Sequence, residues 1–296
     1  MPSQEHEALV AAIPQGGAVD APSVAEQRAN YEAMLGANPP PDTASIEELR
    51  IGECNADWVS VPDSRLDRVI LYLHGGGYVI GSNVAYREFA SRLAQANRAR
   101  VCVLNYRLAP ENPFPAALDD AVTAFGWLLE QGIEPSNIIV AGDSAGGGLT
   151  LATLLSLRDA GGPQAACGVC FSPWTDLAAT GDSAQPGAVD DPLVSDGALS
   201  DMVQAYMAGG DVRNPLASPL YAEYQGLPPL FVLVGGREVL LDDAVRVVER
   251  ARSAGVDVTY FYGEGLVHVW PVLVPTAPES ADALAQMADF TETHCR

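Results

Sequence analysis

A single serine, Ser144, lies between small residues in the stretch AGDSAGGG. The sequence predicts a buried strand at about 137–142 and a helix at about 145–159, so Ser144 stands at the turn between them. Gly142 and Gly146, two positions away on either side, leave room for a strained backbone at such a turn. Glycine-rich stretches after strands also form phosphate-binding turns. The serine therefore indicates a nucleophile only if further groups accompany it.

A serine hydroxyl is a weak nucleophile at neutral pH and needs an adjacent base, most often a histidine oriented by an acid. In hydrolases with a strand-turn-helix serine, the chain order is serine, acid, histidine. Of the four histidines, this order leaves His268 and His294. His294 lies close to the last residue, where a solvated terminus is expected. His268 follows a predicted strand at 256–262, at the sheet edge where the strands end, so we expect His268 to be the base.

The acid should come from the loop after the preceding predicted strand. The stretch VGGREVLLDDAV offers Glu238, Asp242 and Asp243. Asp242 and Asp243 stand at the start of a predicted helix, where acids commonly cap free N–H groups. Glu238 lies closer to the end of the strand, so we expect Glu238 to orient the histidine, with Asp242 as the alternative.

Backbone donors for a developing oxyanion are expected in the stretch HGGG at 74–77, directly after a predicted strand. Consecutive glycines favour a bent backbone that approaches another group closely. We expect the N–H groups of Gly75 and Gly76, with that of Ala145 at the helix start, to stabilise a negative oxygen. Taken alone, the glycines could equally form a tight turn.

The elements that would position these groups alternate along the chain. Apolar runs predict strands at 68–74, 100–106, 137–142, 165–172, 229–235 and 256–262, and amphipathic patterns predict helices at 86–97, 115–131, 145–159, 242–254 and 279–293. This alternation predicts an α/β fold with a mainly parallel central sheet flanked by helices. Residues 1–50 look helical and polar, and residues 178–226 show only loops and a short helix around 197–208. We expect both segments to lie outside the sheet and to form one helical cap.

Composition excludes several classes of protein. The formal net charge of -22 argues against nucleic acid or an anionic membrane as a partner, because both require basic patches. The first residues lack the basic and apolar regions of a signal peptide, and no apolar run is long enough to span a membrane. We therefore expect a cytoplasmic protein without membrane insertion.

The five cysteines show no metal-binding pattern. Cys167 and Cys170 lie in a predicted buried strand, where their side chains should face opposite sides of the sheet. We expect no metal and no cofactor.

Several motifs in a fixed order carry a resemblance to a known family. They are HGGG at 74–77, YRLAPENPFPAALDD at 106–120, GDSAGG at 142–147 and SPWTDL at 172–177. With these motifs the chain resembles, over most of residues 66–272, the hormone-sensitive-lipase-like carboxylesterases, the bacterial family IV branch of the α/β-hydrolases. The resemblance implies an α/β-hydrolase fold, no cofactor and, in many members, a dimer paired through the sheet edge.

The same resemblance implies a triad of Ser144, an acid and His268, and an oxyanion hole formed by Gly75, Gly76 and Ala145. Most relatives carry Asp-Pro-Leu-x-Asp-Glu in the acid loop, whereas this chain has EVLLDD at 238–243. The acid would therefore be Glu238, one methylene longer than usual, and the substitution keeps Asp242 open.

The domain organisation implied by the resemblance is a cap from residues 1–50 and 178–215, and a catalytic α/β-hydrolase domain from residues 51–177 and 216–296. The implied activity is that of a serine carboxylesterase that hydrolyses short- to medium-chain acyl esters through an acyl-enzyme intermediate, with a small-molecule ester as substrate. The alternatives are a lactone or aryl-ester hydrolase, or a non-catalytic small-ligand receptor on the same scaffold. Such receptors lose the histidine, and this chain retains it at 268.

Overall fold

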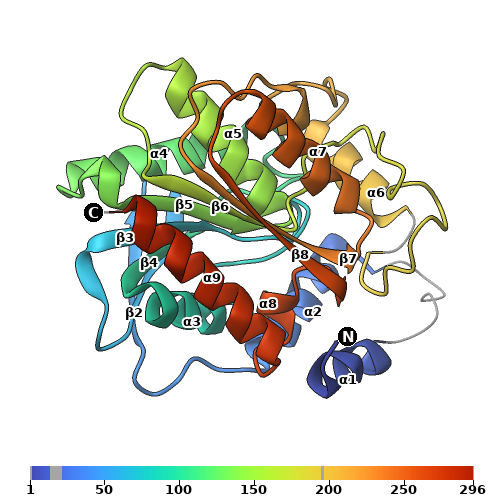
Figure 1. Cartoon of the computed structure of the whole chain (residues 1–296), viewed down its shortest axis with the longest axis horizontal. Coiled ribbons are helices and arrows are strands. Elements are labelled where there is room, and N and C mark those ends of the chain that lie inside the picture. Colours follow the sequence, from blue (N-terminus) through green and yellow to red (C-terminus); the bar gives the residue numbers. More distant parts are fainter. Residues whose placement is uncertain (1, 14–21, 195–196, 296) are drawn as a thin grey trace.

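An eight-stranded sheet runs through the middle of the molecule, with helices on both faces (Figure 1). The computed structural model describes residues 2–13, 22–194 and 197–295. The strands lie in the order β1-β2-β4-β3-β5-β6-β7-β8, and among these eight strands β2 alone runs in the opposite direction to the rest. Their bounds are β1 Ser45–Ile51, β2 Cys54–Ser60, β3 Arg65–Leu73, β4 Ala99–Asn105, β5 Ile138–Asp143, β6 Cys167–Phe171, β7 Leu230–Arg237 and β8 Val258–Val267. The predicted fold class, with a mainly parallel sheet, is confirmed.

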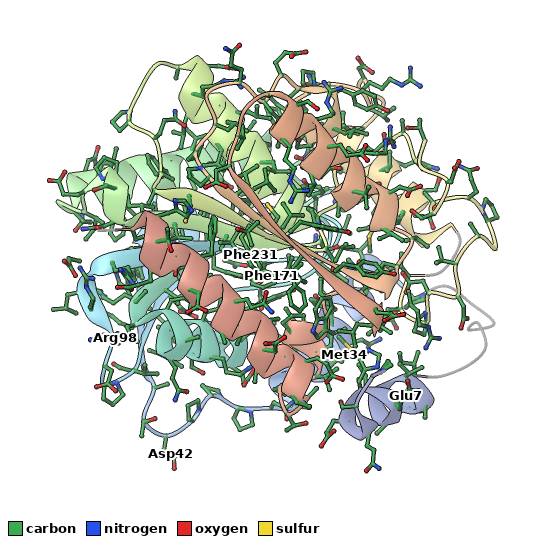
Figure 2. The ribbon with its side chains drawn as sticks, in the orientation of Figure 1. Glu7, Met34, Asp42, Arg98, Phe171 and Phe231 are labelled. Carbon is green, nitrogen blue, oxygen red and sulfur yellow. The ribbon has the colours of Figure 1, made fainter. Side chains whose placement is uncertain are left out.

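The helices form two layers over this sheet. Helices α4 (Ala116–Glu130), α5 (Ala145–Asp159) and α7 (Leu241–Ser253) pack on one face, and α3 (Arg87–Asn97) and α9 (Pro278–His294) on the other. Figure 2 shows Phe171 and Phe231 in the core on the α9 side. Because side chains of a strand alternate between faces, Cys167 joins the core under α9 and Cys170 joins the opposite core, as predicted.

The edge strand β1 corrects the expectation that residues 1–50 lie outside the sheet. Strand β1 pairs with β2 along its whole length, from Ser45 opposite Ser60 to Ile51 opposite Cys54. Most β1 side chains are exposed or only half-buried. The strand is therefore held by backbone pairing more than by burial, which explains why it lacks the apolar run that marked the inner strands.

Three helices lie apart from the two layers, and all three belong to the segments expected to form a cap. They are α1 (Gln4–Ala12), α2 (Val24–Gly36) and α6 (Ala198–Met207). Helix α6 confirms the short helix predicted around 197–208. Residues 14–21 and 195–196 of the expected cap lie outside the described residues. The remaining short elements are α8 (Trp270–Leu273) and the 3-10 helices η1 (Pro135–Asn137) and η2 (Pro219–Tyr221).

Candidate active site

Ser144 occupies a strained turn between β5 and α5. Its backbone has φ 55° and ψ -119°, a conformation that residues with a side chain rarely adopt. Such strain costs on the order of 1–3 kcal/mol and persists only where the surroundings hold it. Here the Ser144 N–H donates to the carbonyl of Phe171 at 2.8 Å, and the Ser144 carbonyl accepts from Trp174 at 2.9 Å. The surrounding strand ends therefore lock the turn.

Backbone atoms crowd the turn so closely that Gly142 and Gly146 leave no room for a side chain. A Cβ on Gly146 would collide with the carbonyl oxygen of Leu73, and one on Gly142 would collide with the carbonyl oxygen of Gly146. The strained turn and the need for small residues around it agree with the sequence analysis.

His268 follows β8 directly and contacts Glu238, which follows β7. The distance between His268 Nδ1 and Glu238 Oε2 is 2.7 Å, and both side chains are buried. The other carboxylate oxygen of Glu238 accepts from the Ser172 hydroxyl at 2.6 Å and from the Gly235 N–H. Glu238 is thus held by two donors while it orients the imidazole.

The other candidate acids have different partners. Asp242 accepts the Ser183 N–H at 2.9 Å, and Asp243 accepts the N–H groups of Thr175 and Asp176 at 2.6 and 2.7 Å. Among the three acids weighed in the sequence analysis, only Glu238 contacts His268.

Burial and charge act in opposite directions on His268. Burial lowers its pKa, but the charge and hydrogen bond of Glu238 raise it, and Asp191 and Asp143 add to this effect. The pKa of His268 therefore lies above its usual 6.5. Because Nδ1 faces Glu238, Nε2 is the nitrogen left to accept a proton.

Ser144 and His268 line one pocket of about 280 Å³. Its walls are mostly apolar and come from the strand ends together with α2 and α6: Tyr31, Met34, Gly76, Gly77, Ile80, Asp143, Ser144, Leu193, Val194, Leu199, Met202, His268, Val269 and Leu273. Within the described residues, no hydrogen bond joins the Ser144 hydroxyl to His268. Such contacts are often long in unliganded enzymes and shorten when substrate binds.

In the glycine-rich loop after β3, the structure differs from the prediction for one oxyanion donor, Gly75. The Gly75 N–H donates to Asp143 Oδ1 at 2.9 Å and lies 3.2 Å from the Tyr86 hydroxyl. It is therefore not free to bind an oxyanion, and the predicted role of Gly75 is wrong in this structure. The buried Asp143 carboxylate, which also accepts from the Tyr72 and Tyr86 hydroxyls, draws this N–H away from the pocket.

Gly77, which the sequence analysis missed, lines the pocket together with Gly76. In the part of the chain that the structure describes, the N–H groups of Gly76 and Gly77 have no acceptor. Ala145 is the first residue of α5, where an N–H has no partner within the helix. Gly77 is the third glycine of the HGGG motif, so the motif itself pointed to it. Which two of the three glycines have free N–H groups could be chosen only once the contact between Gly75 and Asp143 was known.

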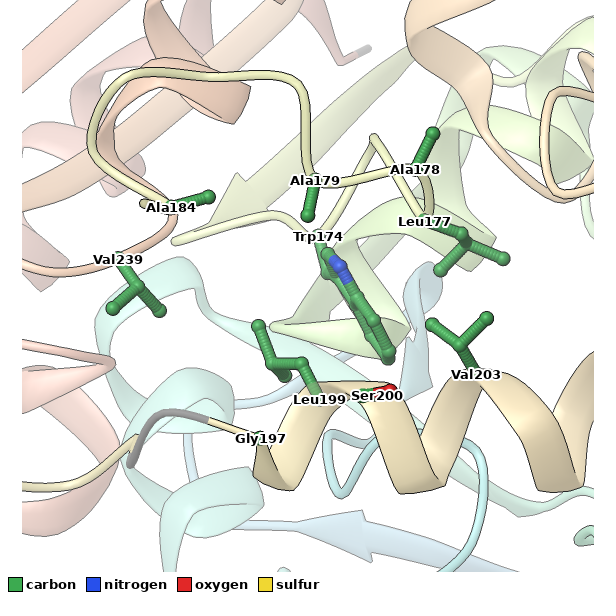
Figure 3. Close-up of a pocket in the computed structure, with 10 residues that line it drawn as sticks. All are labelled: Trp174, Leu177, Ala178, Ala179, Ala184, Gly197, Leu199, Ser200, Val203 and Val239. Carbon is green, nitrogen blue, oxygen red and sulfur yellow. The ribbon is translucent and has the colours of Figure 1, made fainter. Parts of the chain in front are cut away.

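A second apolar cavity, of about 290 Å³, lies beside the site pocket and shares Leu199 with it. Figure 3 shows Leu199 and Val203 projecting from α6 toward Trp174, which lines the opposite wall. Leu199 therefore contributes to the walls of both spaces.

The described ranges 2–13, 22–194 and 197–295 contain no group of three or more histidine, cysteine or acidic side chains that could hold a metal ion. None of their helices combines the length and apolar character that crossing a membrane requires.

Comparison with known proteins gives consistent matches. A family model described as alpha/beta hydrolase fold matches residues 70–272. An acetyl-hydrolase of Streptomyces hygroscopicus is 42% identical over 279 residues, covering 94% of this chain and 91% of that protein. An esterase of Acinetobacter venetianus is 33% identical over 250 residues, covering 84% of this chain and 82% of that protein.

Solved structures match over nearly the whole chain. The crystal structure of an esterase from the bacterial hormone-sensitive lipase family is 44% identical, with a TM-score of 0.95 and coverage of 100% of both chains. EstE5 soaked with p-nitrophenyl butyrate is 37% identical, with a TM-score of 0.94 and coverage of 99% of both chains.

Proposed function

Because this chain belongs to the α/β-hydrolase family and is a carboxylic ester hydrolase of its bacterial hormone-sensitive-lipase branch, we propose that Ser144, His268 and Glu238 form its catalytic triad. The observation that carries the proposal is the 2.7 Å contact between His268 Nδ1 and Glu238, at the pocket that also holds Ser144. This buried pairing leaves Nε2 on the pocket side as a base, which favours catalysis over a receptor role.

The proposed reaction is acyl transfer to water. His268 Nε2 takes the hydroxyl proton as Ser144 Oγ attacks the ester carbonyl carbon, and a tetrahedral oxyanion forms. The N–H groups of Gly76, Gly77 and Ala145 stabilise that oxygen. His268 then protonates the leaving alcohol, and the carbon–oxygen bond breaks to give the acyl-enzyme.

Water completes the cycle by the same steps. His268 removes a proton from water, the hydroxide attacks the acyl carbon, and the proton returns to Ser144 Oγ as the acid leaves. Glu238 stays ionised throughout and stabilises the imidazolium that forms twice in each cycle.

The proposed substrates are esters with short- to medium-chain acyl groups. The pocket is largely apolar, and its volume of about 280 Å³ lies just below the roughly 300–1,000 Å³ of typical small-molecule sites. Leu199 lines both this pocket and the second cavity, so its side chain is the candidate limit on acyl-chain length.

We also propose that α1, α2 and α6 belong to a cap over the catalytic domain, with residues 45–50 assigned to the sheet. Side chains of α2 and α6 contribute to the pocket that contains Ser144, which supports this division. The cap therefore supplies the apolar walls against which an acyl or alcohol group would bind.

The test is hydrolysis of p-nitrophenyl esters from acetate to palmitate by the wild type and Ser144→Ala, with fluorophosphonate labelling of both. We expect turnover that peaks at short chains, with turnover and labelling both lost in the variant. Near-wild-type turnover by folded Ser144→Ala would contradict the nucleophile. A peak at palmitate would contradict the proposed substrate class.

A further inference from the structure

A histidine near the start of the chain contacts Val267, the residue just before His268. His6, on α1, is fully buried, and its Nε2 accepts the backbone N–H of Val267 at 3.1 Å. Val267 is the last residue of β8, the strand at the edge of the sheet. Edge strands leave part of their backbone without a neighbouring strand, and here a side chain of α1 provides the acceptor.

Helix α1 is also connected to the chain on the other side of His268. The Ser3 N–H donates to the carboxylate of Glu279, and the Trp270 indole donates to the carbonyl of Glu279 at 3.3 Å. Together with the contact of His6, α1 is thus linked to the positions immediately before and shortly after His268.

We infer that His6 is a positioning residue for the proposed base. By holding the Val267 N–H, it fixes the backbone from which His268 projects and so preserves the contact with Glu238. The inference rests on the proposed role of His268 and assigns no substrate contact to His6. Its physical basis is that a buried backbone donor keeps its position only while it has an acceptor.

The contact depends on the protonation state of His6. Nε2 can accept only when the ring is neutral, with its proton on Nδ1. That Nδ1 is buried without a partner among the described residues, so nothing there stabilises a charged ring directly. The charged groups that act on the ring are Glu7 on α1 itself, Glu279 on α9 and Arg237 on β7.

Burial is the largest influence and lowers the pKa of His6 below 6.5. Arg237 acts in the same direction, and Glu7 and Glu279 oppose it. The folded state therefore favours the neutral ring, and this preference costs stability as the pH falls below 6.5. Since the pKa of His268 is raised, acidification protonates His268 first and breaks the contact of His6 at lower pH.

The test compares His6→Leu, which removes the acceptor, with His6→Gln, whose amide oxygen can accept at any pH. His294→Leu is the matched control, because His294 lies on α9 and has no contact with Val267. The readouts are the hydrogen-exchange protection of the Val267 amide and the kcat and KM for p-nitrophenyl acetate.

We expect His6→Leu to lose at least about tenfold in both protection and kcat, with KM changed much less, because misplacing a catalytic group affects mainly the chemical step. His6→Gln should keep both near wild type. Wild-type protection and kcat in folded His6→Leu would overturn the inference.

A pH comparison tests the same contact if His6→Leu fails to fold. As the pH is lowered from 7 to the acid limit at which both proteins stay folded, the protection factor of the Val267 amide should fall in the wild type but not in His6→Gln, and equal protection in the two proteins throughout would overturn the inference. Repeating the exchange in Ser144→Ala separates this outcome from the proposed function, since exchange at Val267 requires no esterase activity.

Discussion

Glu238→Gln keeps the length of the side chain but removes its charge and one of its two acceptor oxygens. In the structure, one carboxylate oxygen accepts from Ser172 and Gly235, and the other faces His268 Nδ1. The glutamine oxygen is needed by the Gly235 N–H, so its amide group is left facing the imidazole. An amide N–H cannot accept from Nδ1, and His268 is forced into the tautomer with its proton on Nε2.

That tautomer cannot take the proton of Ser144. The corresponding change of the acid to its amide in a serine triad lowers kcat about 10⁴-fold, which is about 5 kcal/mol of transition-state stabilisation. We expect a loss of this order in Glu238→Gln.

The pH profile should change as well. In the wild type, activity requires neutral His268 and falls as the pH drops through a pKa above 6.5. Without the charge of Glu238, the effect of burial prevails, so the acid limb of the residual activity should move to lower pH.

The assay is kcat/KM for p-nitrophenyl acetate from pH 5 to 9, with Asp242→Asn as the matched control. The amide oxygen of that asparagine can still accept the Ser183 N–H, so its activity should stay near wild type. A larger loss in Asp242→Asn, or a loss below about tenfold in folded Glu238→Gln, would refute the assignment of the acid.

Three further changes follow from the packing. Gly146→Ala places a Cβ against the carbonyl oxygen of Leu73 and should destabilise the protein by about 1–3 kcal/mol or more, measured by urea unfolding; unchanged stability would contradict the crowding. Leu199→Ala removes side-chain volume that lines both cavities and should raise the ratio of hexanoate to acetate kcat/KM, whereas an unchanged ratio would show that this side chain does not limit chain length. Arg28→Leu removes the bonds from α2 to Glu111 and to two backbone carbonyls, so we expect the free energy of unfolding to fall by about 1–2 kcal/mol and KM to rise; urea unfolding with wild-type stability would contradict this.

Much of the fold was predictable because the inner strands and their helices carry strong local patterns. The predicted helix at 145–159 coincides with α5, and the six predicted strands correspond to β3 through β8. Strands β1 and β2 were missed: the exposed side chains of β1 give no apolar run, and Asn55 and Asp57 interrupt the apolar residues of β2. A strand held at the edge by backbone pairing leaves little trace in hydrophobicity.

The turn at Ser144 and the order of serine, acid and histidine were determined by the sequence alone, because strand, turn and helix signals act over a few neighbouring residues. Tertiary structure decided the partners. Glu238 rather than Asp242 meets His268 because Ser172 and Gly235 hold its carboxylate there.

The same holds for the glycine-rich loop and the first helix. The N–H of Gly75 donates to Asp143, whereas Gly76 and Gly77 line the pocket. His6 accepts the N–H of Val267, which lies near the other end of the chain. Contacts between residues far apart in sequence depend on how the elements pack, and no local pattern encodes them.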